Sequence, residues 1–163
     1  STSNGWAGSM YYDCNVGGTG LFMLEWTVQM TIMGQPMPVS AVLSSPRKIL
    51  PAVADIGSGT SWTFNYSLAI EGEFPVTIPT SGTLYDYGVA KETWLGVERK
   101  VYTVRGEYTQ DRSGLDLVGM GGTINAVAEY KYAEGLGLVS EVTQDASTNE
   151  IIMKKTLTAA TGL

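Results

Sequence analysis

The feature that most constrains this fold is the strict alternation of apolar and mainly polar side chains over residues 20–32. Successive side chains of a β-strand point to opposite faces, so a period of two predicts a strand with one buried face. Burial of each large side chain contributes about 1.5–3 kcal/mol, which makes this strand a major source of stability. The apolar positions are Phe22, Leu24, Trp26, Val28, Met30 and Ile32.

Similar stretches recur along the chain and predict an all-β fold. They are separated by Gly, Pro, Asn and Asp turns at intervals of about 10–15 residues, the pattern of a β-sandwich or barrel. We expect a single-domain, mainly antiparallel curved sheet of about nine or ten strands, either a half-barrel or a barrel. Residues 1–8 are expected to form an N-terminal tether and residues 9–163 the single β domain. The expected strands are 9–16, 20–32, 37–43, 61–71, 74–78, 83–94, 97–108, 123–132, 138–143 and 149–158.

Turn-forming residues divide these strands. Residues 79–82 (Pro-Thr-Ser-Gly) predict a turn, and Gly88 predicts a bulge within the following strand. Residues 44–59 form the longest expected loop, in which the apolar segment 49–56 is either one helical turn or a plug. No amphipathic helix is expected.

Composition excludes several classes of function. The chain has no histidine, one cysteine and a net charge of -6. It therefore lacks the commonest general base and zinc ligand, and its basic residues are too scattered to bind a phosphate backbone. We expect no enzymatic activity, no cofactor, no metal and no nucleic-acid partner.

The remaining chemical candidates are few. Cys14 is expected to be a buried small apolar residue, with a disulfide between two chains as the alternative. Two pairs of carboxylates are candidates for acid–base catalysis, namely Glu71 with Glu73 and Asp111 with Asp116. Both pairs fall at expected turns, where acidic side chains ordinarily serve solubility.

The segment from residue 130 to 143 carries the most specific motif. Its pattern resembles the closing hairpin of uncharacterised exported proteins and lipoproteins of bacteria. Residues 59–66 resemble the Gly-x-x-Trp-x-x-x-Tyr strand of that group, and residues 97–108 resemble its Val-Tyr-x-Val strand. The resemblance implies a curved sheet or half-barrel like that of periplasmic lipoprotein carriers. The motif residues are Tyr130, Tyr132, Ala133, Gly135, Gly137, Leu138 and Val139.

Composition also favours export. Only 16% of the residues are charged, well below the roughly 25% of ordinary domains, and glycine and tyrosine are abundant. The polar, small residues 1–5 are typical of a chain after a processed leader or a lipid-modified cysteine. We expect a periplasmic protein, an outer-membrane lipoprotein or a cell-surface protein, with an N-terminal lipid anchor as a candidate. No apolar run reaches the roughly 18 residues of a membrane-spanning helix, so no transmembrane segment is expected.

Aromatic side chains on the expected inward faces form the candidate binding site. They either fill a solid core or line an apolar cleft that holds a lipid or another hydrophobic small molecule. The first hypothesis is therefore a non-catalytic exported binding module. The alternative is a structural or interaction protein of the cell envelope, with a solid core and an envelope protein as partner. The candidate residues are Trp26, Trp62, Tyr66, Tyr102, Tyr130 and Tyr132.

A polar stripe is a second candidate surface. Glu25, Thr27 and Gln29 alternate with the apolar residues of the strand 20–32. They form either a solvated outer face or a polar ligand surface on the sheet.

Overall fold

The computed structural model describes residues 8–13, 20–32, 35–42, 47–70 and 75–159. Over residues 8–13, 20–32 and 35–42 the structure describes mainly the backbone. The side chains of Trp26, Glu25, Thr27 and Gln29 are among those that it does not describe. Cys14 and the Glu71–Glu73 pair also lie outside the described residues, so the predictions about them stay predictions.

The regular structure of the described residues is β-strand, with two short 3-10 turns, η2 (Val53–Asp55) and η3 (Ser113–Val118). The alternating sequence pattern therefore forms the elements it predicts, and the all-β, antiparallel expectation is confirmed. The strands are β1 (Gly8–Asp13), β2 (Gly20–Ile32), β3 (Gln35–Val42), β4 (Arg47–Pro51), β5 (Ser61–Ile70), β6 (Val76–Trp94), β7 (Val97–Asp111), β8 (Thr123–Ala133), β9 (Gly137–Asp145) and β10 (Ile151–Thr156).

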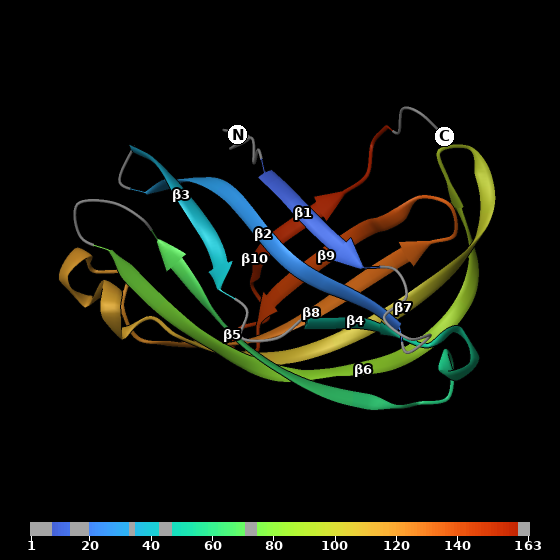
Figure 1. The fold of residues 1–163 in the computed structure, drawn as a ribbon, viewed down its shortest axis with the longest axis horizontal. Helices are drawn as coiled ribbons and strands as arrows, with labels where there is room; N and C mark the ends of the chain where they lie inside the picture. The colour runs from blue at the N-terminus through green and yellow to red at the C-terminus, as the bar shows by residue number, and fades with distance from the viewer. Residues whose placement is uncertain (1–7, 14–19, 33–34, 43–46, 71–74, 160–163) are drawn as a thin grey trace.

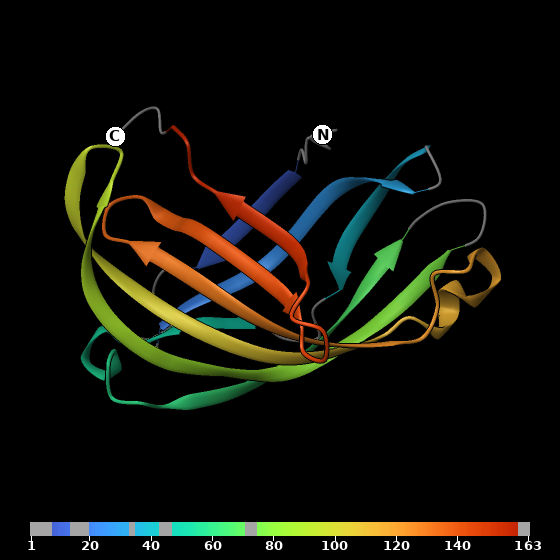
Figure 2. The ribbon, with the colours of Figure 1, turned by 180° about the vertical axis from the view of Figure 1, so that it is seen from behind.

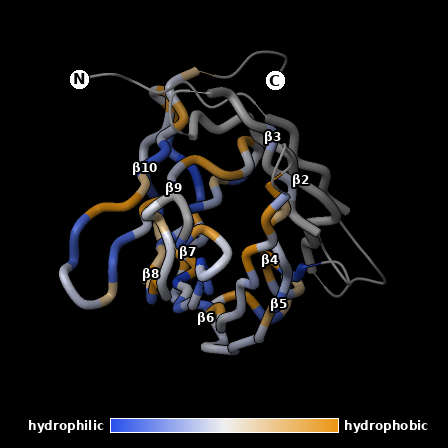
Figure 3. Tube along the Cα trace, turned by 90° about the vertical axis from the view of Figure 1, so that its left-hand side faces the viewer, coloured by the Kyte–Doolittle hydropathy of each residue, from blue (hydrophilic) through white to orange (hydrophobic). Residues whose placement is uncertain are grey.

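These strands form one strongly curved sheet (Figures 1 and 2). Its order is β1-β2-β3-β5-β6-β7-β8-β9-β10, and β4 pairs with β2 beside β3. Viewed along the long axis, the trace curls from β10 and β9 round through β6 to β4 and β2 (Figure 3). No pairing between described residues joins β1 to β10, so the sheet is open and a closed barrel is not confirmed.

The turn predicted at residues 79–82 is wrong, because β6 runs through it without a break. Pro79 pairs with Ser67 of β5, while the pairing with β7 begins only at Thr80. Pro79 therefore lies at a position where β6 has a partner strand on one side only, which is the kind of position at which a sheet tolerates proline. Gly82 serves close packing, because a Cβ there would lie 2.7 Å from the Tyr108 Cβ and 2.9 Å from the Phe64 ring.

Two irregularities shape the long strands. The register of β6 and β7 shifts between Asp86 and Gly88, which confirms the bulge predicted at Gly88. A second shift lies between Lys131 and Tyr132 on β8, opposite β9. The turn between these strands has positive φ at Gly135 and Gly137, as the motif predicts.

The loop predicted at residues 44–59 is wrong over Arg47–Pro51, which form β4. β4 lies between β2 and β5 (Figure 3), where β3 has ended. One alternative for residues 49–56 was a single helical turn, and within this segment only η2 has helical geometry. Ile49 and Leu50 reach across the concave face to the tyrosines of β7 and β8.

Apolar side chains pack on both faces of the sheet. On the concave face Phe64, Leu84 and Val104 form the central cluster. On the opposite face of β7 and β8, Val101 packs with Ala133 and Val139. Among the described residues no helix is long and apolar enough to cross a membrane.

Candidate functional site

The concave face brings the described aromatic candidates together. Tyr102 of β7 pairs in register with Tyr132 of β8, and Val104 pairs with Tyr130. Directly paired residues of antiparallel strands lie on one face, so these side chains share it. Trp62 and Tyr66 of β5 pack on the same central cluster as Tyr130. Alternation thus placed these five residues on one face, and Trp26 is the sixth candidate, whose side chain is not described.

The aromatic set is partly packed and partly accessible. Tyr132 is 7% exposed and packs against Ile49 of β4. The other four described candidates, Trp62, Tyr66, Tyr102 and Tyr130, are half-buried. The concave face is therefore solid at its centre and keeps accessible aromatic surface around that centre.

β4 is attached to β5 by a specific contact. The Trp62 Nε1–H donates a hydrogen bond to the Lys48 carbonyl oxygen at 2.9 Å, and the Lys48 Nζ lies 5.7 Å from the Trp62 ring centre. Trp62 thus holds in place the strand that carries Arg47. Sequence reasoning missed this strand, although an Ile-Leu pair bounded by prolines was a signal for a short buried element.

Arg47 is the cation at the centre of the aromatic set. Its guanidinium carbon lies 4.1 Å from the ring centre of Phe64 and 5.3 Å from that of Tyr66. Its Nε is buried and has no hydrogen-bond partner in the part of the chain that the structure describes. The ion pairs found in the described part of the chain involve other residues, so no described carboxylate pairs with Arg47.

Tyr66 and Tyr130 beside this cation, and Tyr108 on the same face, keep their phenol protons. Burial raises the pKa of Tyr130 far above that of an exposed phenol, against the opposing effect of the Arg47 guanidinium. Burial likewise raises the pKa of Tyr66 and of Tyr108. The nearby Glu141 carboxylate adds to the rise in all three. Neutral phenols of this kind can donate hydrogen bonds to an anion at any physiological pH.

Polar groups of β9 also face inward, which the sequence pattern did not predict. Regular alternation along residues 138–143 would put Leu138 and Val142 on one face, but the bulge at Lys131 and Tyr132 changes the register. Glu141 therefore pairs with Tyr130 and is 8% exposed, while Val142 turns to the other face. No local signal marks this bulge, because it depends on the partner strand.

Glu141 is already engaged. Its Oε2 lies 3.0 Å from the Nζ of Lys155 on the neighbouring strand β10. Because Glu141 forms its ion pair with Lys155, it does not serve as the ion-pair partner of Arg47. The concave face thus combines apolar aromatic surface, neutral phenol donors and cations that lie over aromatic rings, of which Arg47 is the most deeply placed and has no ion-pair partner among the described residues.

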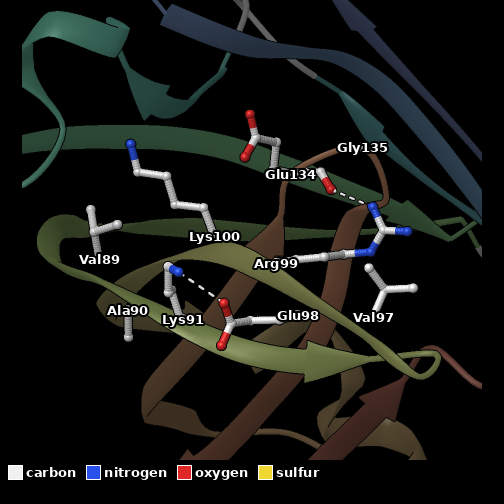
Figure 4. A pocket seen from close by; sticks show the side chains of 9 residues that line it. All are labelled: Val89, Ala90, Lys91, Val97, Glu98, Arg99, Lys100, Glu134 and Gly135. Atoms are coloured by element: carbon white, nitrogen blue, oxygen red, sulfur yellow. Dashed lines mark hydrogen bonds and ion pairs between the residues drawn. The ribbon is translucent and has the colours of Figure 1, made fainter.

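A hollow of about 740 Å³ adjoins the aromatic set at the end of the β6–β7 hairpin (Figure 4). Val89, which lines it, pairs in register with Tyr102, and the Nζ of Lys100 lies 5.4 Å from the Tyr102 ring centre. Two contacts shape its wall: Lys91 to Glu98 at 2.8 Å, and Arg99 Nη1 donating to the Glu134 carbonyl at 2.9 Å. The lining residues are Val89, Ala90, Lys91, Val97, Glu98, Arg99, Lys100, Glu134 and Gly135.

The acid pair Asp111 with Asp116 has a structural role at Asp111. The backbone N–H of Ser113 donates to the Asp111 Oδ1 at 3.0 Å, and this hydrogen bond lowers the pKa of Asp111. Asp116 is exposed within η3. Within the described ranges, no group of three or more acidic, cysteine or histidine side chains is placed to hold a metal ion.

Comparison of the chain with protein-family models, with curated proteins and with solved structures gave no match. The resemblance carried by the Tyr130–Val139 motif therefore stays a hypothesis.

Proposed function

We propose that this protein is an exported, non-catalytic binding protein of the cell envelope that holds a hydrophobic ligand on the concave face of its sheet. The observation that carries the proposal is the set of four half-buried aromatic side chains on one curved face. Binding sites for small molecules are concave, mainly apolar and aromatic, and hold a few polar groups. Arg47 and its surrounding phenols supply such polar groups.

The proposal includes a half-barrel architecture with one open side. The unpaired edges of β1 and β10 among the described residues support it, as does the contact of Ile49 with Tyr132 across the interior. An open side admits a ligand to the concave face without unfolding of the sheet. Export and attachment to the envelope are supported by composition and by the motif at residues 130–139.

The alternative is a structural or interaction protein of the cell envelope without a small-molecule ligand. The close packing at the centre of the concave face favours it, since Leu84 is 1% and Ile49 is 6% exposed. In that case the aromatic side chains serve mainly as core, and the partner is another envelope protein.

Native mass spectrometry of the protein as purified, followed by organic extraction and lipid analysis, tests the proposal. We expect a bound hydrophobic molecule whose mass is lost on extraction. A ligand-free mass, together with unchanged tryptophan fluorescence on addition of fatty acids or phospholipids, would contradict the proposal and favour the alternative.

A matched pair of variants locates the site. Tyr102→Ala removes an aromatic side chain from the concave face and is expected to reduce ligand retention severalfold. Tyr87→Ala removes an aromatic side chain that is 59% exposed, and retention is expected to stay at the wild-type level. Equal retention by both variants would place the ligand away from the concave face.

A further inference from the structure

We infer that the ligand is a single-chain amphiphile with a carboxylate head, and that Arg47 binds this carboxylate. The inference rests on the proposed function and adds the chemical class of the ligand. It names a fatty-acid-like molecule whose chain lies along the aromatic residues of the concave face.

The first argument is that Arg47 has no ion-pair partner among the described residues. A buried ionic group is strongly destabilising unless it is paired and hydrogen-bonded. The Arg47 guanidinium packs on the rings of Phe64 and Tyr66. Among the described residues, its Nε has no hydrogen-bond partner and no carboxylate forms an ion pair with it. Cation–π contacts and hydrogen bonds to the Tyr130 and Tyr66 hydroxyls offset part of this cost, but the Nε–H has no acceptor among the described residues. A ligand carboxylate would supply that acceptor.

The second argument is the set of neighbouring donors. Tyr66 and Tyr130 interact with the guanidinium and keep their phenol protons. A phenol and a guanidinium on one side of a site suit an anion better than a neutral or cationic head. Glu141, whose carboxylate acts on both phenols, is paired with Lys155.

The third argument is the room available. Ile49 and Leu50 of β4 already contact the tyrosines of β7 and β8, which narrows the face beside Arg47. The adjoining hollow beside Tyr102 has a volume of about 740 Å³, within the usual range for one small ligand. A single chain fits this space better than the two chains of a phospholipid.

Titration of the full chain with three probes of equal length tests the inference. The probes are dodecanoate, dodecanol and dodecyl phosphate, each below its micelle concentration, with tryptophan fluorescence and calorimetry as readouts. We expect dodecanoate to bind at least about tenfold more tightly than dodecanol, because a hydrogen-bonded charge pair contributes at least that factor. We expect dodecyl phosphate to bind more weakly than dodecanoate.

The matched variants are Arg47→Gln and Arg105→Gln, each of which removes one positive charge. Arg105 pairs with Glu129 at 3.2 Å and is exposed on the other face of the sheet. We expect Arg47→Gln to bind dodecanoate and dodecanol with similar affinity, and Arg105→Gln to keep the wild-type preference. Tyr130→Phe keeps the ring and is expected to reduce the preference severalfold, which serves as a second test if Arg47→Gln does not fold.

The outcomes separate the inference from the proposed function. Equal binding of dodecanoate and dodecanol by the wild-type protein overturns the carboxylate head and leaves a hydrophobic site. Tighter binding of dodecyl phosphate overturns the carboxylate in favour of a phosphate head. An unchanged preference in Arg47→Gln overturns the role of Arg47. Absence of binding by all three probes overturns both proposals.

Discussion

Gly82 lies where the concave face is closely packed. The ring of Phe64 and the side chain of Tyr108 occupy the space that a Cβ at this position would need. Gly106, opposite Leu84, has the same role, since a Cβ there would lie 2.7 Å from the Leu84 Cδ2. Gly82, which the sequence pattern predicts as part of a turn, thus leaves room for the side chains of Phe64 and Tyr108.

Gly82→Ala is expected to destabilise the protein by about 1–3 kcal/mol, because the added methyl group must displace backbone as well as side-chain atoms. Urea unfolding followed by circular dichroism measures the loss. Gly88→Ala is the control on the same strand, since nothing lies within 4 Å of its added Cβ. Equal losses in the two variants would contradict the packing argument.

Asp145 fixes the turn between β9 and β10. Its Oδ1 accepts hydrogen bonds from the Ser147 hydroxyl at 2.6 Å and from the backbone N–H of Thr148 at 2.9 Å. These bonds lower the pKa of Asp145 to about 2 from its usual 3.8. Because the folded-state pKa is the lower one, the ionised carboxylate stabilises the fold above about pH 4, and this contribution is lost as the pH falls towards 2.

Asp145→Ala should therefore be less stable than the wild type at neutral pH, and the difference should shrink between pH 4 and pH 2. Thermal unfolding of both proteins across that range measures it. A difference that stays constant with pH would show that the carboxylate charge has no part in the turn.

At the scale of elements, β4 determines the character of the site. This short strand fills the place beside β2 where β3 has ended, and it brings Arg47 and Ile49 to the concave face. A hydrogen bond from the Trp62 indole to the Lys48 carbonyl oxygen links this strand to β5. A strand held by few contacts is expected to open more readily than the central strands.

Trp62→Phe removes the hydrogen bond to Lys48 and is expected to destabilise the protein by about 1 kcal/mol. It should also raise amide hydrogen exchange within β4. Trp94→Phe is the control, because the Trp94 Nε1–H donates only to the Glu92 side chain of its own strand at 3.1 Å. Unchanged exchange of β4 in Trp62→Phe would show that its pairing with β2 alone holds the strand.

At the scale of the whole molecule, curvature joins strands that are distant in the sheet order. Ile49 of β4 meets Tyr132 of β8, although β5, β6 and β7 separate them in the sheet. A ligand on the concave face would therefore contact both walls at once. Binding to the folded state alone stabilises it by mass action.

Dodecanoate at 100 times its dissociation constant is thus expected to raise the free energy of unfolding by about 2.7 kcal/mol. Thermal unfolding at increasing probe concentration measures the rise, with dodecanol as the uncharged comparison. A midpoint that does not move with saturating dodecanoate would contradict binding to the concave face.

Local pattern determined much of this protein. Period-two alternation gave the strands and the face of Trp62, Tyr66 and Tyr102, since side-chain direction in a strand depends only on neighbouring residues. The bulge at Gly88 and the glycine turn after Ala133 were also predictable, because glycine has a conformational range that other residues lack.

Tertiary structure alone decided the rest. Arg47 and Glu141 reach the interior only through a strand that pairs at long range and a bulge that depends on a partner. Residues 79–82 stay extended because all four pair with β5 on one side, and residues 80–82 also pair with β7 on the other. Whether the edge strands β1 and β10 pair with each other likewise depends on the curvature of the whole sheet. These features arise from contacts between residues distant in the chain, and no short stretch of sequence contains both partners.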